Sequence, residues 1–462
     1  MDIGKIHRIY FVGIGGIGMS ALARYFLCGG YEIAGYDRTS TPLTDKLSSE
    51  GCLIHFEDNV ERIPEAFRNP GNRNSTMIVY TPAIPDDHGE LSFFRHHSYY
   101  ILKRSELLGL ITRASKGIAI AGTHGKTTVS AVIAHLLKQS DLDCSAFLGG
   151  ISKNYESNLI LGKGDLVVME ADEYDRSFLQ LNPYFAVITA IDPDHLDIYE
   201  DYKHLKKAFI SFIDKIKEGG KLLYKKGLDI KRGMPGTIET YTYSLDPGAD
   251  FHTKNIRTEN DFSLFDVITP GDPLQVRFGF PGKMNIENAL AAVAVAWLLG
   301  IPDEQIRKAM VHFSGVKRRF DFQIRQKDLV YIDDYAHHPE ELKACILSVR
   351  EMFPGKKITG IFQPHLYSRT RDFATGFARS LEMLDELILL EIYPAREMPI
   401  TGVGSEMIFE QTSMRNKTLC TKNNLLRLVG EKEFEVLLTL GAGDIDQFVQ
   451  PIRDSLLEKW EG

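Results

Sequence analysis

The fold of this 462-residue chain is decided by the stretch Ile118-Ala-Ile-Ala-Gly-Thr-His-Gly-Lys-Thr-Thr128. Its first four residues are apolar and predict a short buried strand. Glycines follow, and residues 127–138 then have the composition of a helix. A strand, a glycine turn and a helix in this order are typical of a phosphate-binding unit in an α/β domain.

The turn in this unit has residue types that suit a nucleoside triphosphate. Lys126 can reach the β- and γ-phosphates, and the hydroxyl of Thr127 can bind Mg²⁺. The pattern G-x-x-x-x-G-K-[ST] is incomplete, because Ile120 stands where its first glycine would be. A glycine turn without a ligand is the alternative to the ATP and Mg²⁺ that we predict. The ATP-binding residues predicted in the turn are Gly122, Thr123, His124, Gly125, Lys126, Thr127 and Thr128.

Acidic residues follow the apolar run 166–169, which predicts another strand of the same domain. Glu170 is nearest to the end of that strand and is the first candidate for a Mg²⁺ ligand. The acids at 172–175 could instead form a solvated loop. A second acidic group surrounds His195, which could bind a second metal ion or contact the reacting groups. A purely structural histidine is the alternative there.

Another glycine turn, the first in the chain, lies near the N-terminus, at Gly13-Ile-Gly-Gly-Ile-Gly18. It fits G-x-G-x-x-G, follows an apolar run at 8–12 and precedes a helical pattern at 19–27. Asp37 comes about 20 residues later, at the end of the next predicted strand, where an acid commonly binds a ribose hydroxyl. The turn predicts a diphosphate-bearing ligand but does not distinguish NAD from UDP, and a turn without a ligand is the alternative.

Further apolar runs alternate with helical patterns along the rest of the chain. A polar loop is expected at 68–75, a β-rich insertion at 236–280 and an apolar helix at 285–299. The predicted fold class is α/β with a Rossmann-like N-terminal domain, a central P-loop ATPase-type domain and a Rossmann-like C-terminal domain. The domains are placed at residues 1–105, 106–315 and 316–462. Additional strands are expected at 77–80, 186–189, 329–332, 358–362, 387–390 and 435–440, and a helix at 339–352.

The composition is that of an ordinary globular protein, with 44% hydrophobic and 25% charged residues. A net charge of −8 argues against nucleic-acid or membrane-surface binding, which requires a positive field. The five cysteines include no CxxC pair, which fits reduced thiols. The N-terminus has no signal-peptide pattern, and we expect a cytoplasmic protein.

Together the two turns suggest phosphoryl transfer from ATP near a diphosphate-bearing ligand. If the acceptor is a carboxylate, the product is an acyl phosphate, which reacts readily with amines. Such an intermediate must be kept from water, which favours closure of the domains around it.

Several further motifs appear in the same order as in one enzyme family. They are Glu170-Ala-Asp-Glu-Tyr-Asp-Arg-Ser-Phe178, Asp194-His-Leu-Asp197, Asn285-Ile-Glu-Asn288, Gly315-Val-Lys-Arg-Arg319, Asp333-Asp-Tyr-Ala-His-His-Pro339 and Gln363-Pro-His-Leu-Tyr-Ser-Arg-Thr-Arg-Asp372. With the two glycine turns, they resemble the Mur ligases of peptidoglycan synthesis from about residue 8 to 410. The turn 122–128 and the segment 333–339 resemble the branch that acts on UDP-N-acetylmuramate.

This resemblance implies a role for each matching residue. Asp37 would lie near the uridine, Asn288 would contact the adenine, and His195 would lie at the second metal or the reacting carboxylate. The diphosphate of UDP would be held by Gly15, Gly16 and Gly18. The third domain would close on the nucleotide through Arg319 and Asp334. The groups facing the acceptor and the amino acid would be His338, Arg369 and Arg371, since arginine pairs well with a carboxylate.

The resemblance implies ATP-dependent ligation of L-alanine to UDP-N-acetylmuramate by a monomer or homodimer. A ligase that attaches a preformed tripeptide during cell-wall recycling is the nearest alternative. An NAD-linked dehydrogenase and a nucleotide-dependent switch are alternatives from other classes. The chain departs from the family pattern at Met284, Leu366, Tyr174 and Ala336, and Ile210 stands where relatives carry a modified lysine.

Overall fold

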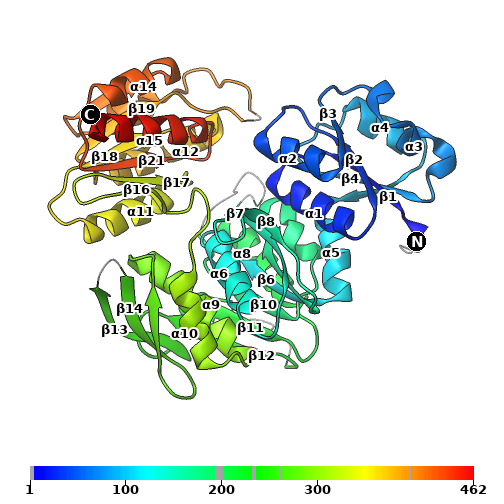
Figure 1. Cartoon of the computed structure of the whole chain (residues 1–462), viewed down its shortest axis with the longest axis horizontal. Helices are drawn as coiled ribbons and strands as arrows, with labels where there is room; N and C mark the ends of the chain where they lie inside the picture. Colours follow the sequence, from blue (N-terminus) through cyan, green and yellow to red (C-terminus); the bar gives the residue numbers. More distant parts are fainter. Residues whose placement is uncertain are drawn as a thin grey trace. The chain divides into compact units, whose positions relative to one another are not determined.

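The computed structural model describes residues 5–192, 199, 201–230, 236–259, 262–395 and 397–461, without the side chains of residues 175, 460 and 461. Figure 1 shows the course of the chain with its helices and strands labelled. The chain divides into two compact units. The first unit comprises Met1–Ile256, Leu264–Arg277 and Asn288–Phe313, and the second comprises Arg257–Ser263, Phe278–Glu287 and Ser314–Gly462. Both glycine turns therefore belong to the first unit.

The first sheet has five parallel strands in the order β3-β2-β1-β4-β5, a Rossmann-like arrangement. The strands are β1 Arg8–Val12, β2 Glu32–Tyr36, β3 Leu53–His55, β4 Thr76–Tyr80 and β5 Tyr100–Lys103. The helical segments are α1 Ile17–Cys28, α2 Pro42–Glu50, η2 Val60–Arg62, α3 Glu65–Arg68, η3 Pro70–Asn72, α4 Gly89–His96 and α5 Arg104–Ala114. Ile9 and Phe11 of β1 belong to one apolar core, whereas Tyr10 and Val12 belong to another. Both faces of the sheet are covered, which explains why its central strands β1 and β4 are mainly apolar and buried.

The second sheet has ten strands in the order β15-β14-β13-β12-β11-β10-β6-β9-β7-β8. The strands are β6 Lys116–Ala121, β7 Ser145–Ser152, β8 Ser157–Ile160, β9 Leu166–Ala171, β10 Phe185–Ile188, β11 Lys221–Lys225, β12 Glu239–Ser244, β13 Phe251–Glu259, β14 Phe262–Ile268 and β15 Leu274–Phe278. The helical segments are α6 Lys126–Lys138, η4 Tyr174–Gln180, α8 Tyr202–Ile213, α9 Lys283–Leu298 and α10 Asp303–His312. Strand β6 is parallel to β9 on one side and to β10 on the other. The segments that follow these three strands therefore meet at one edge of the sheet.

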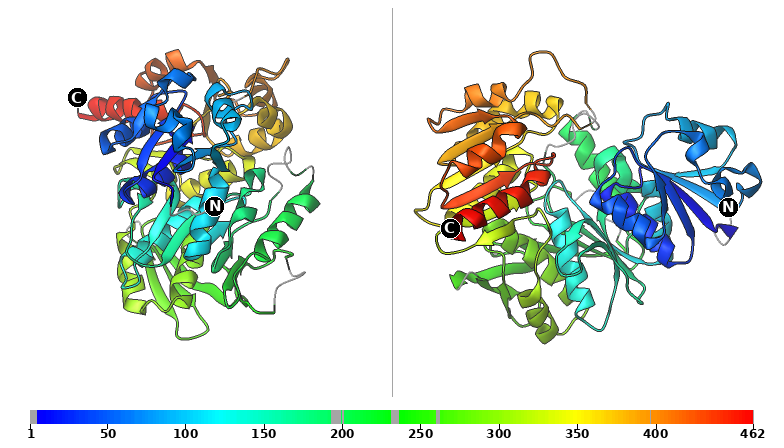
Figure 2. Two further views of the ribbon diagram at one scale, coloured as in Figure 1. Left: turned by 90° about the vertical axis from the view of Figure 1, so that its right-hand side faces the viewer. Right: turned by 45° about the horizontal axis from the view of Figure 1, so that its top comes forward.

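The third sheet has six strands in the order β16-β17-β21-β18-β19-β20, and β16 is its antiparallel edge strand. The strands are β16 Asp321–Arg325, β17 Val330–Asp334, β18 Ile358–Phe362, β19 Glu386–Leu390, β20 Lys417–Cys420 and β21 Val436–Leu440. The helices are α11 Pro339–Met352, α12 Tyr367–Leu381, α13 Glu406–Gln411, α14 Lys422–Gly430 and α15 Asp446–Glu461. Tyr331 packs with residues of α14 and α15, and Ile332 packs with residues of α11 and α12. Helices thus cover both faces of this sheet (Figure 2).

The predicted α/β class with mainly parallel sheets is confirmed. Strands β12 to β15 form the β-rich insertion expected at 236–280. The expectation of a plain loop at 68–75 was wrong in detail, because α3 ends at Arg68 and η3 follows it. Asn69 accepts a hydrogen bond from the amide of Gly71 at 2.9 Å, and Pro70 has the fixed φ that a helical turn requires. The domain boundaries near 105 and 315 stay predictions.

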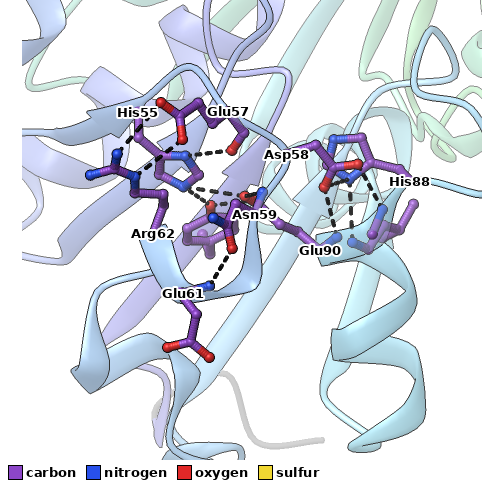
Figure 3. A network of polar contacts seen from close by, with 11 residues as sticks. His55, Glu57, Asp58, Asn59, Glu61, Arg62, His88 and Glu90 are labelled. Carbon is purple, nitrogen blue, oxygen red and sulfur yellow. Dashed lines mark hydrogen bonds and ion pairs between the residues drawn. The ribbon is translucent and has the colours of Figure 1, made fainter.

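A partly buried polar network joins β1, β3 and α4 (Figure 3). The Tyr10 hydroxyl donates to Glu90 Oε2 at 2.7 Å and lies 2.7 Å from His55 Nε2. The Asp58 carboxylate accepts from the amides of Gly89 and Glu90 at 2.8 and 3.0 Å. Burial raises the pKa of Glu90 to about 7. A carboxyl group in the core of this domain is therefore close to its protonation point at neutral pH.

Candidate active site

The turn between β6 and α6 requires glycine at both of its ends. Gly122 has φ +138° and Gly125 has φ +81°, values that other residues rarely adopt. A side-chain carbon at residue 122 would collide with the Thr189 hydroxyl, and one at residue 125 would lie 2.7 Å from Asn288 Oδ1. The structure thus brings Asn288, predicted for the adenine, directly against the predicted phosphate turn.

The middle of this turn is anchored to the chain that follows β10. The Thr123 amide donates to the Ala190 carbonyl at 3.1 Å, and the Thr123 hydroxyl accepts from the Asp192 amide at 3.1 Å. His124 Nε2 lies 3.6 Å from a carboxylate oxygen of Asp192. Gly125 is the N-cap of α6, with Thr128 in the first helical turn, so the helix presents its first backbone amides at this point. A rigid turn at a helix N-terminus is suited to bind phosphate.

Lys126 opens α6 and is held inside the turn by three oxygen atoms. Its Nζ donates to the Gly122 carbonyl at 2.8 Å and to Oε1 and Oε2 of Glu173 at 2.9 and 2.8 Å. Burial alone would lower the pKa of Lys126, but the charges of Glu173, Asp172 and Glu170 outweigh it and raise the pKa above its usual value. Lys126 therefore stays a cation at any physiological pH.

Thr127 and Glu170 face one another, as the sequence predicts for a Mg²⁺ site. The Thr127 hydroxyl donates to Glu170 Oε2 at 3.1 Å. Glu170 Oε1 accepts from the Ser130 hydroxyl at 3.3 Å and from the Gly149 amide at 2.6 Å, which fixes the carboxylate. Hydroxyl and carboxylate oxygens are the ligands that Mg²⁺ prefers. Mg²⁺ also keeps waters and substrate phosphates as ligands, so two protein oxygens fit the ion.

The first glycine turn lies between β1 and α1 and has φ +89° at Gly13. The Gly15 amide donates to Asp37 Oδ2 at 2.7 Å, and a side-chain carbon at residue 15 would lie 2.8 Å from that oxygen. Gly16 is the N-cap of α1. The predicted residues of the diphosphate site are thus brought together, with Asp37 in contact with the turn itself. Their part in UDP binding stays a prediction.

Arg104 is a site residue that the sequence reasoning missed. It opens α5, and its guanidinium occupies the space that a side-chain carbon at Gly18 would need. Its Nη2 also lies 3.6 Å from Asp172 Oδ2, in the acidic segment after β9. Arg104 therefore links the first glycine turn to the acids beside the second. A basic residue directly after a strand was the only signal, because neither partner is near it in the sequence.

In the second unit, Asp334 and Arg319 are organised around the end of β17. The Asp334 carboxylate accepts from the amides of Phe320 and Ala336 at 2.7 and 2.8 Å. The Arg319 guanidinium lies over the Tyr335 ring, 4.9 Å from its centre. Burial raises the pKa of Asp334, and the charge of Arg319 acts against this shift. The structure thus brings together both residues predicted to close on the nucleotide.

The residues predicted to face the acceptor lie in two different settings. His338 is the buried N-cap of α11, and its ring packs 4.9 Å from that of Phe373. Arg369 is half-buried in the first turn of α12. Arg371 is exposed and pairs with its neighbour Asp372 at 2.7 Å. The guanidinium keeps further N–H donors that could contact substrate, and this role stays a prediction.

One predicted site residue, His195, lies outside the described residues. Among the described residues, no group of three or more His, Cys, Asp or Glu side chains is placed to hold a metal ion. In that same part of the chain, no helix is long and apolar enough to cross a membrane.

The fold and this site define a class of protein, the α/β enzymes that bind a nucleotide at a glycine turn. Three family models match successive parts of the chain: the catalytic domain of the Mur ligase family at residues 8–116, the Mur ligase middle domain at 120–296 and the Mur ligase glutamate ligase domain at 318–441. The chain belongs to the Mur ligase family. Members of this family are ATP-dependent ligases that form amide bonds.

Individual relatives match over the whole chain. The UDP-N-acetylmuramate–L-alanine ligase of Parabacteroides distasonis is 52% identical over 461 residues, covering 99% of both chains. That of Porphyromonas gingivalis strain W83 is 50% identical, covering 97% of this chain and 99% of the relative. The crystal structure of the UDP-N-acetylmuramate–alanine ligase of Thermotoga maritima is similar with a TM-score of 0.82 and 26% identity, covering 98% and 99%. A murein peptide ligase from Psychrobacter arcticus, 19% identical with a TM-score of 0.72, shares the fold.

Proposed function

We propose that this chain joins L-alanine to UDP-N-acetylmuramate and converts ATP to ADP and phosphate. The observation that carries the proposal is the convergence of Lys126, Thr127 and Glu170 at one glycine turn, in the same unit as the diphosphate turn. The substrates are those of the relatives that match over the whole chain at about 50% identity. The tripeptide alternative has support from solved structures that share the fold at 19% and 21% identity.

In the first step, a carboxylate oxygen of the sugar nucleotide attacks the γ-phosphorus of ATP. The new P–O bond forms as the bond to ADP breaks, and ADP leaves with the electron pair. Lys126 would neutralise charge on the β- and γ-phosphates, and the amides at the start of α6 would bind the same oxygens. Asn288 would contact the adenine. The product is an acyl phosphate.

Mg²⁺ would be held by the oxygens of Thr127 and Glu170, and it would supply charge neutralisation between the phosphates. Glu170 is pre-positioned for this role by Ser130 and the Gly149 amide. His195 stays the predicted ligand of a second ion. Arg319 and Asp334 stay the residues predicted to close on the nucleotide.

In the second step, the amine of L-alanine attacks the acyl carbon of the acyl phosphate. The C–N bond forms, the C–O bond to phosphate breaks, and the proton that the amine loses is taken up by the released phosphate. His338, Arg369 and Arg371 would orient the amino acid, and an arginine would pair with its carboxylate. The acyl phosphate must be shielded from water during this step.

A coupled phosphate-release assay with candidate amino acids tests the proposal. With ATP, Mg²⁺ and UDP-N-acetylmuramate present, we expect fastest release with L-alanine and slower release with glycine or L-serine. Faster release with L-Ala-D-Glu-diaminopimelate than with L-alanine would favour the tripeptide alternative. Release that needs no sugar nucleotide would contradict ligation.

A further inference from the structure

Glu173 is a buried carboxylate that the proposed chemistry does not use. It lies directly before η4, in the acidic segment after β9, and its side chain is fully buried. Its two oxygens both contact the Lys126 ammonium, at 2.9 and 2.8 Å. The Tyr199 hydroxyl donates to the Glu173 backbone carbonyl at 2.5 Å, which helps to fix the segment.

All three N–H donors of the Lys126 ammonium have a hydrogen-bond acceptor in the structure. An ammonium group has three N–H donors and no acceptor. The structure supplies three acceptors, the two Glu173 oxygens and the Gly122 carbonyl. A phosphate oxygen can therefore bind Lys126 only if at least one of these bonds is given up. A buried cation is costly without a partner, so the exchange is favourable only when phosphate replaces Glu173 as that partner.

From this geometry we propose that Glu173 competes with the phosphates of the nucleotide for Lys126 and so sets nucleotide affinity. The inference rests on the proposed function, because it assumes that Lys126 binds ATP phosphates. Glu173 keeps the ammonium inside the turn, and phosphate binding releases one or both of its hydrogen bonds. Glu173 acts through Lys126 and is a positioning residue.

Glu173→Gln is the variant that separates this role from a simple packing role. Glutamine has the same shape but no charge, and its amide nitrogen is itself a donor that cannot accept from the ammonium. We expect the dissociation constants of ADP and ATP to fall by about tenfold, the effect of losing one charge-assisted competing bond. Calorimetric titration of the full chain with ADP, in Mg²⁺ and in EDTA, measures the change.

A double-mutant cycle with Lys126→Gln identifies the cause of the change. If Glu173 competes for Lys126, the gain in ADP affinity from Glu173→Gln disappears when Lys126 is already replaced. If Glu173 only repels the nucleotide, the gain persists. Asp172→Asn is the matched control, since Asp172 carries the same charge in the same segment and its hydrogen-bond and ion-pair partners are the Tyr174 amide and Arg104. We expect this variant to change ADP affinity by less than about threefold.

Three results would overturn the proposal: unchanged or weaker ADP binding by Glu173→Gln in EDTA, a gain that persists in the Lys126→Gln background, or an equal gain in Asp172→Asn. If Glu173→Gln does not fold, Glu173→Asp serves instead, since its shorter side chain cannot keep both bonds. A wild-type chain that binds no ADP or ATP would contradict the proposed function itself, and so the two failures are distinguishable.

Discussion

We expect phosphoryl transfer to depend strongly on Lys126, because this residue places a cation inside the predicted phosphate turn. Lys126→Ala removes this charge and with it the ion pair that Lys126 forms with the buried Glu173 carboxylate. We expect turnover in the phosphate-release assay to fall at least about 10²-fold, the usual scale for losing one electrostatic stabiliser.

Lys308→Ala is the control for this variant. Lys308 is an exposed lysine of α10 in the same unit, and its replacement removes an equal charge. We expect its turnover to stay within about twofold of wild type, as for most surface substitutions. Near-normal turnover of Lys126→Ala would refute the role of Lys126.

Glu90 is the residue that should make the stability of the first sheet depend on pH. Burial raises the pKa of Glu90 from its usual 4.5 to about 7 in the folded chain. Between these values the folded state holds a proton that the unfolded state has released. The stabilising contribution of Glu90 is therefore fully present below about pH 4.5 and is lost as the pH rises through about 7.

Glu90→Gln should remove this dependence, because the amide imitates the protonated acid. We expect amides of β1 and α4 to exchange with solvent at similar rates in both proteins at pH 5. At pH 8 the wild type should exchange faster, by an amount that corresponds to at most about 3 kcal/mol. Burial lowers the pKa of His55 and of His88, which acts in the opposite direction, but both histidines are present in both proteins. Equal rates at pH 8 would show that Glu90 does not titrate in this way.

At the scale of the element, the unit β6–turn–α6 depends on the backbone shape of its glycines. Gly122→Ala adds a carbon that collides with Thr189, at a φ of +138°. We expect a loss of ADP binding together with a destabilisation well above about 1 kcal/mol. Gly219→Ala is the control, because Gly219 also has a positive φ, +71°, but open space around it. It should cost about 1 kcal/mol and leave ADP binding unchanged, and equal losses in both variants would contradict the importance of the contact.

Elements with a strong local signal could be predicted from the sequence. The unit β6–turn–α6 has its strand, glycines and helix adjacent, and both turns were found for that reason. Short or partly polar strands were missed, such as β8 and the edge strand β16, since their pairing depends on distant neighbours. The pairing of Glu173 with Lys126 joins residues 47 positions apart and has no local signature.

Site residues divide in the same way, into those with a local signal and those whose partners are distant in the sequence. Thr127 was predicted because it follows the glycine turn, and Glu170 because it follows the apolar run 166–169. The parallel pairing of β6 and β9 brings the two residues together. Arg104 could not be recognised, because its partners Gly18 and Asp172 are distant in the sequence and are brought to it by folding.

At the scale of the whole molecule, ligation requires nucleotide, sugar nucleotide and amino acid to act together. We expect ADP release to need ATP, Mg²⁺, UDP-N-acetylmuramate and L-alanine, with omission of any one reducing it to background. ADP release at the full rate with ATP and Mg²⁺ alone would point to a nucleotide-dependent switch. Binding of NADH in place of the sugar nucleotide would point to a dehydrogenase.

The central claim is that the γ-phosphoryl group of ATP passes to a carboxylate of UDP-N-acetylmuramate before the amide bond forms. The most direct test uses sugar nucleotide labelled with ¹⁸O in that carboxylate, followed by mass spectrometry of the inorganic phosphate. Phosphate that carries one ¹⁸O atom per turnover is the predicted result, since the C–O bond breaks in the second step. Phosphate without the label, alongside normal amide formation, would contradict the account.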